Sequence, residues 1–171
     1  DAWLAHLVMH AERMDVAFVS PHVYLPSGQV VAAGLVASRN FGLLNAYEGA
    51  QDGQDGAVGS LFCDREVSAV GATCTLVARD RLSALGSLSD RYVSSEGTIR
   101  DASWRAALAG LRNISVASRL IEVPEGDRSD FLADAADGQF FLDTHRDTVA
   151  LGDPFYNSNY VRDRADFSVG K

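Results

Sequence analysis

Apolar residues recur at helical spacing over the first 14 residues of the chain. One stripe of that pattern holds Trp3, Leu4, Leu7, Val8 and Ala11. His6, His10 and Arg13 fall on the opposite side. This arrangement predicts an amphipathic helix over residues 2–14.

The pattern then changes to runs of β-branched and aromatic residues. Residues 16–25 and 30–37 predict two strands, joined by a turn at Pro26-Ser27-Gly28. Residues 66–78 form a long apolar stretch, which predicts one buried strand. Gly71 interrupts that stretch and indicates a point where another backbone or a ligand comes close. A further strand is expected at 114–123.

Helices are predicted in two places in the middle of the chain. A short one at 79–85 should stop at Gly86. Thr98 and Asp101 have the spacing of a capping box, so a second helix should begin there and continue through Trp104. The glycine-rich stretch 45–60 predicts a mobile loop that contributes nothing to a core. After residue 123 the chain becomes acidic and helical and then turn-rich.

Length and charge narrow the classes of protein. The chain has 171 residues, of which 47% are hydrophobic and 22% charged, as in ordinary globular proteins. One domain, or one large piece of a domain, is expected. Its 15 basic and 23 acidic residues give a net charge of −8. We therefore expect no nucleic-acid partner, because such proteins carry a basic face.

The two cysteines, Cys63 and Cys74, are too few for a disulfide scaffold. They favour a reducing cytoplasm, with both thiols buried as small hydrophobes. No stretch reaches the roughly 18 apolar residues of a spanning helix. His6 and His10 stand four apart on the expected helix and could share a metal. Since no third ligand is near them in the sequence, a polar helix face is the favoured interpretation.

Four blocks, in order, resemble the second half of family 2 glycosyltransferases. The first is the opening helix with VAFVSPHVYLPSGQVVAAGLV at 16–36, and the second is EVSAVGATCTLVARDRLSALG at 66–86. The third, Asp101-x-x-x-Arg105-x-x-x-x-Gly110, is similar to the end of the family's "E-D-x-D-l-x-x-R-x-x-x-x-G" helix. The fourth is DPFYNSNY at 153–160 with DFS at 166–168. Together they cover most of the chain.

The resemblance implies an α/β fold, with part of a GT-A-like mixed sheet, flanking helices and no N-terminal nucleotide-binding half. It implies that residues 1–123 form the acceptor-side half and that 124–171 form a helical and turn-rich tail. The parent would be a bacterial enzyme of polysaccharide biosynthesis in the cell envelope. It would transfer a sugar, with inversion, from a nucleotide-sugar to a polysaccharide or lipid-linked acceptor. A divalent cation, Mn²⁺ or Mg²⁺, would assist the complete enzyme. The expected location is the cytoplasm, either free or peripheral at the inner face of the membrane, and a homo-oligomer is left open.

The sequence departs from the family at its catalytic aspartate, where it has Ile99. An isoleucine cannot accept a proton. The resemblance therefore leaves Glu96 and Asp101 as catalytic candidates. If the chain belongs to a transferase, we expect at least two of Glu96, Asp101 and Glu122 to share one open cleft, within roughly 10 Å of each other. It assigns substrate binding to Asp90, Trp104 and Arg105. Glu122 stands near the position of a metal-ligating histidine of the family, and glutamate also binds hard cations.

Each candidate also has a plainer interpretation. Asp101 could stabilise a helix terminus, and Glu96 could be a solvated residue of the loop before that helix. Asp90 could form a turn, and Trp104 could belong to the core. The aromatic and amide residues of 155–160 suit sugar rings, and equally suit packing of the tail. Two functions stay open: a transferase whose isolated fragment is inactive, or a catalytically inactive glycosyltransferase-like module that binds glycan or a partner subunit.

Overall fold

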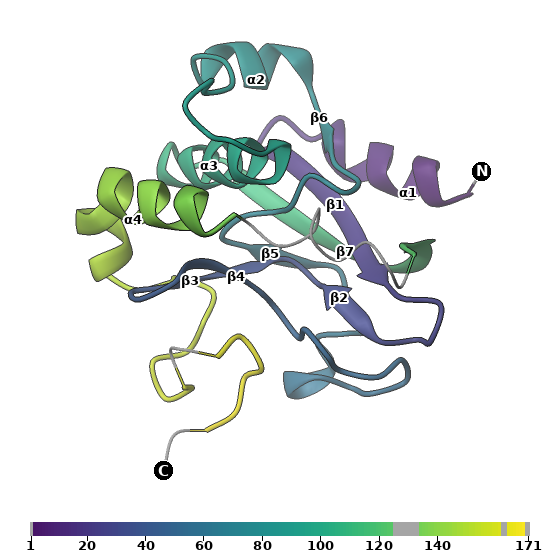
Figure 1. Ribbon diagram of the computed structural model, residues 1–171. Coiled ribbons are helices and arrows are strands. Elements are labelled where there is room, and N and C mark those ends of the chain that lie inside the picture. The colour runs from purple at the N-terminus through teal and green to yellow at the C-terminus, as the bar shows by residue number, and fades with distance from the viewer. Residues whose placement is uncertain (1, 125–133, 162–163, 170–171) are drawn as a thin grey trace.

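A computed structural model describes residues 2–124, 134–161 and 164–169. Its centre is a parallel pair of strands, β1 (Val16–Tyr24) and β7 (Arg112–Glu122). Three short strands extend this pair with antiparallel pairing: β2 (Val30–Ala32) and β6 (Leu76–Val77) on β1, and β5 (Arg65–Val67) on β7. A separate two-stranded sheet joins β3 (Leu35–Ser38) and β4 (Gly42–Asn45). The chain is therefore a mixed α/β structure around a mixed sheet, as the sequence predicted (Figure 1).

Helices cover both faces of the central sheet, and every residue of β1 is therefore buried. On one face, Leu7 of α1 (Ala2–Ala11) packs against Val16, Val19 and Ile114. On the other face, α2 (Arg79–Ala84) and α3 (Ser95–Leu108) pack against Phe18. The fourth helix, α4 (Ala135–Ala150), lies beside α3 and next to β4 (Figure 1). The expected helices at 2–14 and 79–85 are thus confirmed, the first ending at Ala11.

The single strand expected at 30–37 is wrong, because Gly34 separates β2 from β3. Gly34 has φ +80°, a backbone conformation that favours glycine. A Cβ there would also lie 2.6 Å from Cγ1 of Val67. Hydrophobicity continues across this break, so periodicity alone does not reveal it.

The long strand expected at 66–78 is also wrong. Only its ends are strands, namely β5 and β6, while residues 70–75 form an irregular segment. Within it, the Thr75 hydroxyl donates to the Gly71 carbonyl oxygen at 2.7 Å. A close approach at Gly71 is present, but the group that approaches is the Glu96 side chain rather than the backbone or ligand that we expected.

Helix α3 begins about one turn before the expected capping box. Its N-cap is Ser94, whose hydroxyl oxygen accepts from the Gly97 backbone N–H at 2.9 Å. Asp137 of α4 holds this start by accepting from the Val93 and Ser94 backbone N–H groups, at 2.7 and 3.0 Å. Asp101 therefore lies inside the helix, and its predicted place in a cap is wrong. The cap comes from a contact across 43 residues, which no local motif contains.

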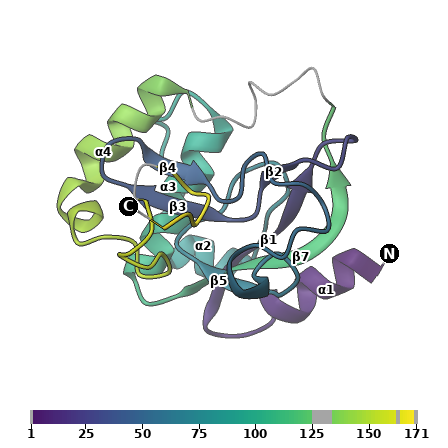
Figure 2. The ribbon, with the colours of Figure 1, turned by 90° about the horizontal axis from the view of Figure 1, so that it is seen from below.

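The glycine-rich stretch 45–60 is mostly loop, as expected, with a short 3-10 turn at Ala57–Gly59. It does contribute to the core, contrary to expectation. Tyr47 is buried, and its ring stacks on Phe167 of the tail, with centroids 4.3 Å apart. Tyr156 also packs in this cluster, so this aromatic residue of the tail packs onto the core. Figure 2, viewed from below, shows the tail lying across β3 and β4.

Among the helices of the described residues, none combines the length and the apolar character needed to cross a bilayer.

Candidate functional site

The Glu96 carboxylate lies at the start of α3 against the segment that contains Gly71. Its Oε2 accepts from the Ala72 backbone N–H at 2.6 Å. Its Oε1 accepts from Nε of Arg100, one turn along the helix, at 2.8 Å. The side chain is almost fully buried, so these donors replace the water that a carboxylate otherwise binds. The predicted solvated loop position for Glu96 is wrong, because α3 begins earlier than expected.

Arg100 connects this carboxylate to the small sheet. Its guanidinium donates to the Leu43 carbonyl oxygen and to Oδ1 of Asn45, each at 2.7 Å. Arg100 is also buried, so its charge is balanced by Glu96 and by these oxygens rather than by solvent. The pair joins α3, β4 and the segment at residues 71–72 into one polar network.

An open groove of about 280 Å³ lies on the other side of Arg100, between β4 and the first turns of α4. Amide, carboxylate and aromatic side chains line it, including Asn40, Phe41, Asn45, Glu48, Asp134 and Gln139. Phe41 is 57% exposed. Arg100 is the one cation among the described residues of this lining, and its guanidinium is already hydrogen-bonded. The groove therefore suits a polar ligand that carries no negative charge and has an apolar face.

Glu96 itself faces a much smaller recess, lined also by Ser20, Asn45 and Thr73. That recess has a volume of about 10 Å³. This is about the space of one water molecule, which is too small for a sugar. Asn45 lines both the recess and the groove, so Asn45 and Arg100 separate Glu96 from the larger space.

Asp101 belongs to a second network, on another side of α3. Its Oδ1 accepts from the Tyr92 hydroxyl at 2.9 Å and contacts Nε2 of His145 at 2.7 Å. Its Oδ2 accepts from Nε of Arg105 at 2.8 Å. Burial raises the pKa of Asp101, but the hydrogen bonds from His145, Arg105 and Tyr92 outweigh it, and the net shift is downward. Glu96 and Asp101 thus have separate partners, which weighs against the common cleft that we expected.

The other predicted site residues are spread around the molecule. Trp104 is buried in the core and contacts Phe141 edge-on, with ring centroids 5.8 Å apart. Asp90 lies exposed in a turn. Glu122 lies exposed at the end of β7, opposite Tyr24 of β1. Trp104 therefore belongs to the core and Asp90 to a turn, as their structural interpretations expected. The roles of Trp104 and Asp90 in substrate binding stay predictions.

Ile99, the residue that the predicted resemblance aligns with a catalytic aspartate, packs against the apolar cluster between α3 and the sheet. A carboxylate at this position would point into the core rather than toward the groove.

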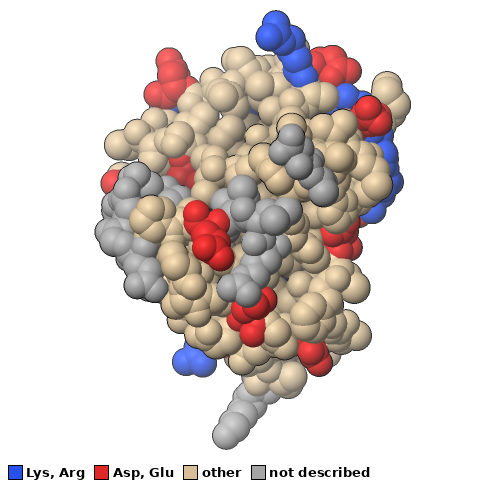
Figure 3. All heavy atoms as spheres, turned by 90° about the vertical axis from the view of Figure 1, so that its right-hand side faces the viewer, with Lys and Arg blue, Asp and Glu red and all other residues tan. Residues whose placement is uncertain are grey.

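Sequence reasoning did not find the groove residues, because Phe41, Asn45 and Gln139 belong to no motif and come from distant segments. It also placed Cys63 in the interior, which is wrong because Cys63 is exposed. Figure 3 shows the side of the molecule that lies at the right in Figure 1. There, acidic side chains are scattered and no broad basic area covers the described residues.

The chain is similar to an uncharacterized protein, y4gI, of Sinorhizobium fredii (strain NBRC 101917 / NGR234). The two are 26% identical over 179 aligned residues. The similarity covers 96% of this chain and 19% of that protein, so the chain spans about a fifth of the length of its relative. No family model and no solved structure matches the chain.

Proposed function

We propose that this chain is the acceptor-side part of a bacterial glycosyltransferase resembling family 2. The whole enzyme would transfer a sugar, with inversion, from a nucleotide-sugar to a polysaccharide or lipid-linked acceptor. The observation that carries this proposal is the groove between β4 and α4, which would hold the acceptor glycan. The nucleotide-binding half would lie outside this chain. The reaction would take place in the cytoplasm, either free or at the inner face of the membrane.

The lining of the groove supports a neutral glycan rather than an anion. Sugar rings present hydroxyl groups together with apolar C–H faces. The Gln139 amide, whose NH₂ group also donates to Asp143 at 3.1 Å, carries an oxygen that can accept from hydroxyls, and the exposed Phe41 ring offers an apolar surface. Glu48 and Asp134 accept hydrogen bonds from hydroxyls but repel anions.

Glu96 is the proposed catalytic carboxylate, which would remove the proton of the acceptor hydroxyl. Both its oxygens already accept hydrogen bonds, from Ala72 and Arg100. The groove side chain nearest to it in the network is Arg100, so acceptor binding would have to displace that guanidinium. Asp101 would act as a positioning residue, since its own network holds Tyr92, Arg105 and His145 together.

The divalent cation also stays a proposal for the whole enzyme. Within the described ranges, Glu122 belongs to no group of three side chains that could hold a metal ion. The residues present do not complete a Mn²⁺ or Mg²⁺ site around Glu122, so we assign no step of the reaction to a cation here.

The second candidate function is a catalytically inactive module that binds glycan or a partner subunit. Two observations favour it: Ile99 packs into the core, and Glu96 has both oxygens engaged. It shares the glycan groove with the first candidate and differs from it only in chemistry.

Glycan binding tests what both candidates share. The chain would be screened against a panel of neutral oligosaccharides from bacterial surface polysaccharides, with binding followed by ligand-observed NMR. Phe41→Ala should weaken the strongest interaction about 2- to 12-fold, since an aromatic contact contributes about 0.5–1.5 kcal/mol. Phe62→Ala is the matched control, because Phe62 is 58% exposed and lies outside the groove lining. Binding that is equal in both variants would exclude the groove.

Turnover separates the two candidates. The whole natural protein would be assayed with labelled nucleotide-sugars and membrane-derived acceptors, and its Glu96→Gln variant compared with Glu12→Gln, an exposed control. Loss of turnover in Glu96→Gln alone, with the circular dichroism spectrum unchanged, supports the transferase. Full turnover in Glu96→Gln excludes Glu96 as the base. Glycan binding without any wild-type turnover favours the inactive module.

A further inference from the structure

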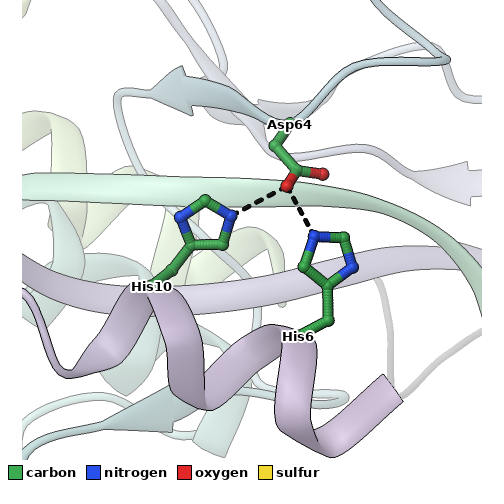
Figure 4. Close-up of side chains that lie close together, drawn as sticks. All are labelled: His6, His10 and Asp64. Atoms are coloured by element: carbon green, nitrogen blue, oxygen red, sulfur yellow. Dashed lines mark hydrogen bonds and ion pairs between the residues drawn. The ribbon is translucent and has the colours of Figure 1, made fainter. Parts of the chain in front are cut away.

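Two histidines of α1 and one aspartate from a distant loop meet at a single point. Nε2 of His6 and Nε2 of His10 lie 2.7 and 2.8 Å from the same carboxylate oxygen, Oδ2 of Asp64. Figure 4 shows both imidazole rings pointing from α1 toward Asp64, which precedes β5. More than 50 residues of sequence separate the aspartate from each histidine. The third ligand that the sequence lacked is therefore supplied by the fold.

The three side chains are held in place by the sheet. Leu7, between the two histidines in sequence, is 2% exposed and anchors α1 on β1 and β7. The four-residue spacing then places His6 and His10 one turn apart on the same side of the helix. On the other side of the contact, Oδ1 of Asp64 accepts from the Ala117 backbone N–H of β7 at 2.9 Å. This bond orients the carboxylate so that Oδ2 faces both rings.

We propose that His6, His10 and Asp64 form a binding site for Zn²⁺. Two imidazole nitrogens and one carboxylate oxygen are a donor set that suits zinc, whereas Mg²⁺ and Ca²⁺ prefer oxygen donors throughout. The three ligand atoms lie within 4.8 Å of one another, and the three residues are the one such group among the described residues.

The geometry needs only a small adjustment. With zinc about 2.0–2.1 Å from each ligand atom, neighbouring ligands in a tetrahedral site lie about 3.3 Å apart. The two nitrogen–oxygen contacts would therefore open by about 0.5 Å. Side-chain rotation supplies this movement without a shift of α1, because neither imidazole is fully buried.

Three protein ligands leave a fourth position for solvent. The side chains of His6, His10 and Asp64 are 38%, 14% and 24% exposed, so water can reach the ion. The bound ion would join α1 to the loop before β5 and, through Asp64, to β7. Zinc should therefore stabilise the folded chain, since the site does not exist when the chain is unfolded. This site is independent of the groove and of the proposed transferase.

Zinc binding to the full 171-residue chain tests the proposal. The protein would be stripped with a chelator and titrated with zinc chloride by calorimetry, and its thermal unfolding followed with and without zinc. We expect one ion per chain and a higher Tm with zinc. His10→Gln and Asp64→Asn should each weaken binding more than tenfold, because even changes outside the ligand shell cost about 10- to 100-fold.

Cys63→Ser is the control variant, because this exposed thiol is the neighbour of Asp64 and binds zinc readily when free. The control should bind zinc as the wild type does. Cobalt substitution gives a second readout, since binding by nitrogen and oxygen produces no thiolate charge-transfer band. If His10→Gln fails to fold, the more exposed His6→Gln replaces it. Absence of a 1:1 site, binding as tight as the wild type in both ligand variants, or loss of binding in Cys63→Ser would each overturn the proposal.

Discussion

The Glu96 side chain fills the space that a side chain at position 71 would need. A Cβ on Gly71 would lie 2.5 Å from Oε1 of Glu96, closer than nonbonded atoms approach. Gly71 has no unusual φ, so its requirement for glycine is steric. One close contact thus links the irregular segment between β5 and β6 to the start of α3.

Gly71→Ala should lower the free energy of unfolding by about 1–3 kcal/mol, because the buried Glu96–Arg100 pair must move. Urea denaturation would measure this. Gly138→Ala is the control: a Cβ there meets only the Phe41 carbonyl oxygen at 3.7 Å, and alanine favours the helix. Equal stability of Gly71→Ala and wild type would mean that Glu96 leaves this position easily.

Asp137→Asn should destabilise the start of α3. Its carboxylate accepts from two backbone N–H groups and from the Ser94 hydroxyl, and an asparagine would turn an NH₂ group toward one of these donors. The expected loss is about 2–3 kcal/mol, as for buried hydrogen bonds to a charged group. Asp134→Asn is the matched change at the exposed N-cap of α4, where asparagine caps as well as aspartate. Similar losses in both variants would contradict the special role of Asp137.

His22 should make the protein less stable as the pH falls from about 6.5 to 4. It is fully buried on β1, and burial lowers its pKa to about 4, with a smaller contribution from the charge of Arg65. The unfolded chain, with an ordinary histidine pKa near 6.5, binds the proton more readily in this range. The resulting loss is about 3 kcal/mol between pH 7 and pH 4.

His22→Leu, which keeps a similar volume, should remove this part of the pH dependence. Urea denaturation at several pH values would give the free energy of unfolding of both proteins. The difference between the two values should change between pH 6.5 and 4. A constant difference would mean that His22 is protonated in the folded state as easily as in the unfolded one.

Asp101 should stabilise the protein at neutral pH and lose this effect in acid. Its pKa is lowered in the folded state, so its contribution is present above the ordinary aspartate value near 3.8 and disappears as the pH falls through the folded value. Asp101→Asn should cost about 2–3 kcal/mol at pH 7, because three buried hydrogen bonds lose their charged acceptor.

The difference in free energy of unfolding between Asp101→Asn and the wild type should therefore become smaller toward pH 2. Chemical denaturation at several pH values would measure it. Asp90→Asn, at an exposed turn, is the control and should change stability by less than about 0.5 kcal/mol. A gap that stays constant down to pH 2 would show that the Asp101 charge is not what matters.

Local patterns predicted the elements whose signals lie within a few residues. The helix of Leu7 follows from the spacing of apolar residues, and the end of α2 follows from Gly86, which has φ +85°. The breaks at Gly34 and in residues 70–75 escaped prediction because they depend on Val67 and Glu96, which approach from other elements. The start of α3 was not predicted for the same reason, because Asp137 of α4 accepts a hydrogen bond from the Ser94 backbone N–H there.

The sequence by itself determined an α/β chain with a strand over residues 16–25, because runs of β-branched and aromatic residues favour strands and apolar residues at helical spacing favour helices. It also placed His6 and His10 four residues apart on one helix. Tertiary structure alone decided that Glu96 faces Gly71, that Asp101 faces His145, and that Asp64 meets the two histidines. These are contacts between segments far apart in the chain, and only packing of the sheet and helices brings such segments together.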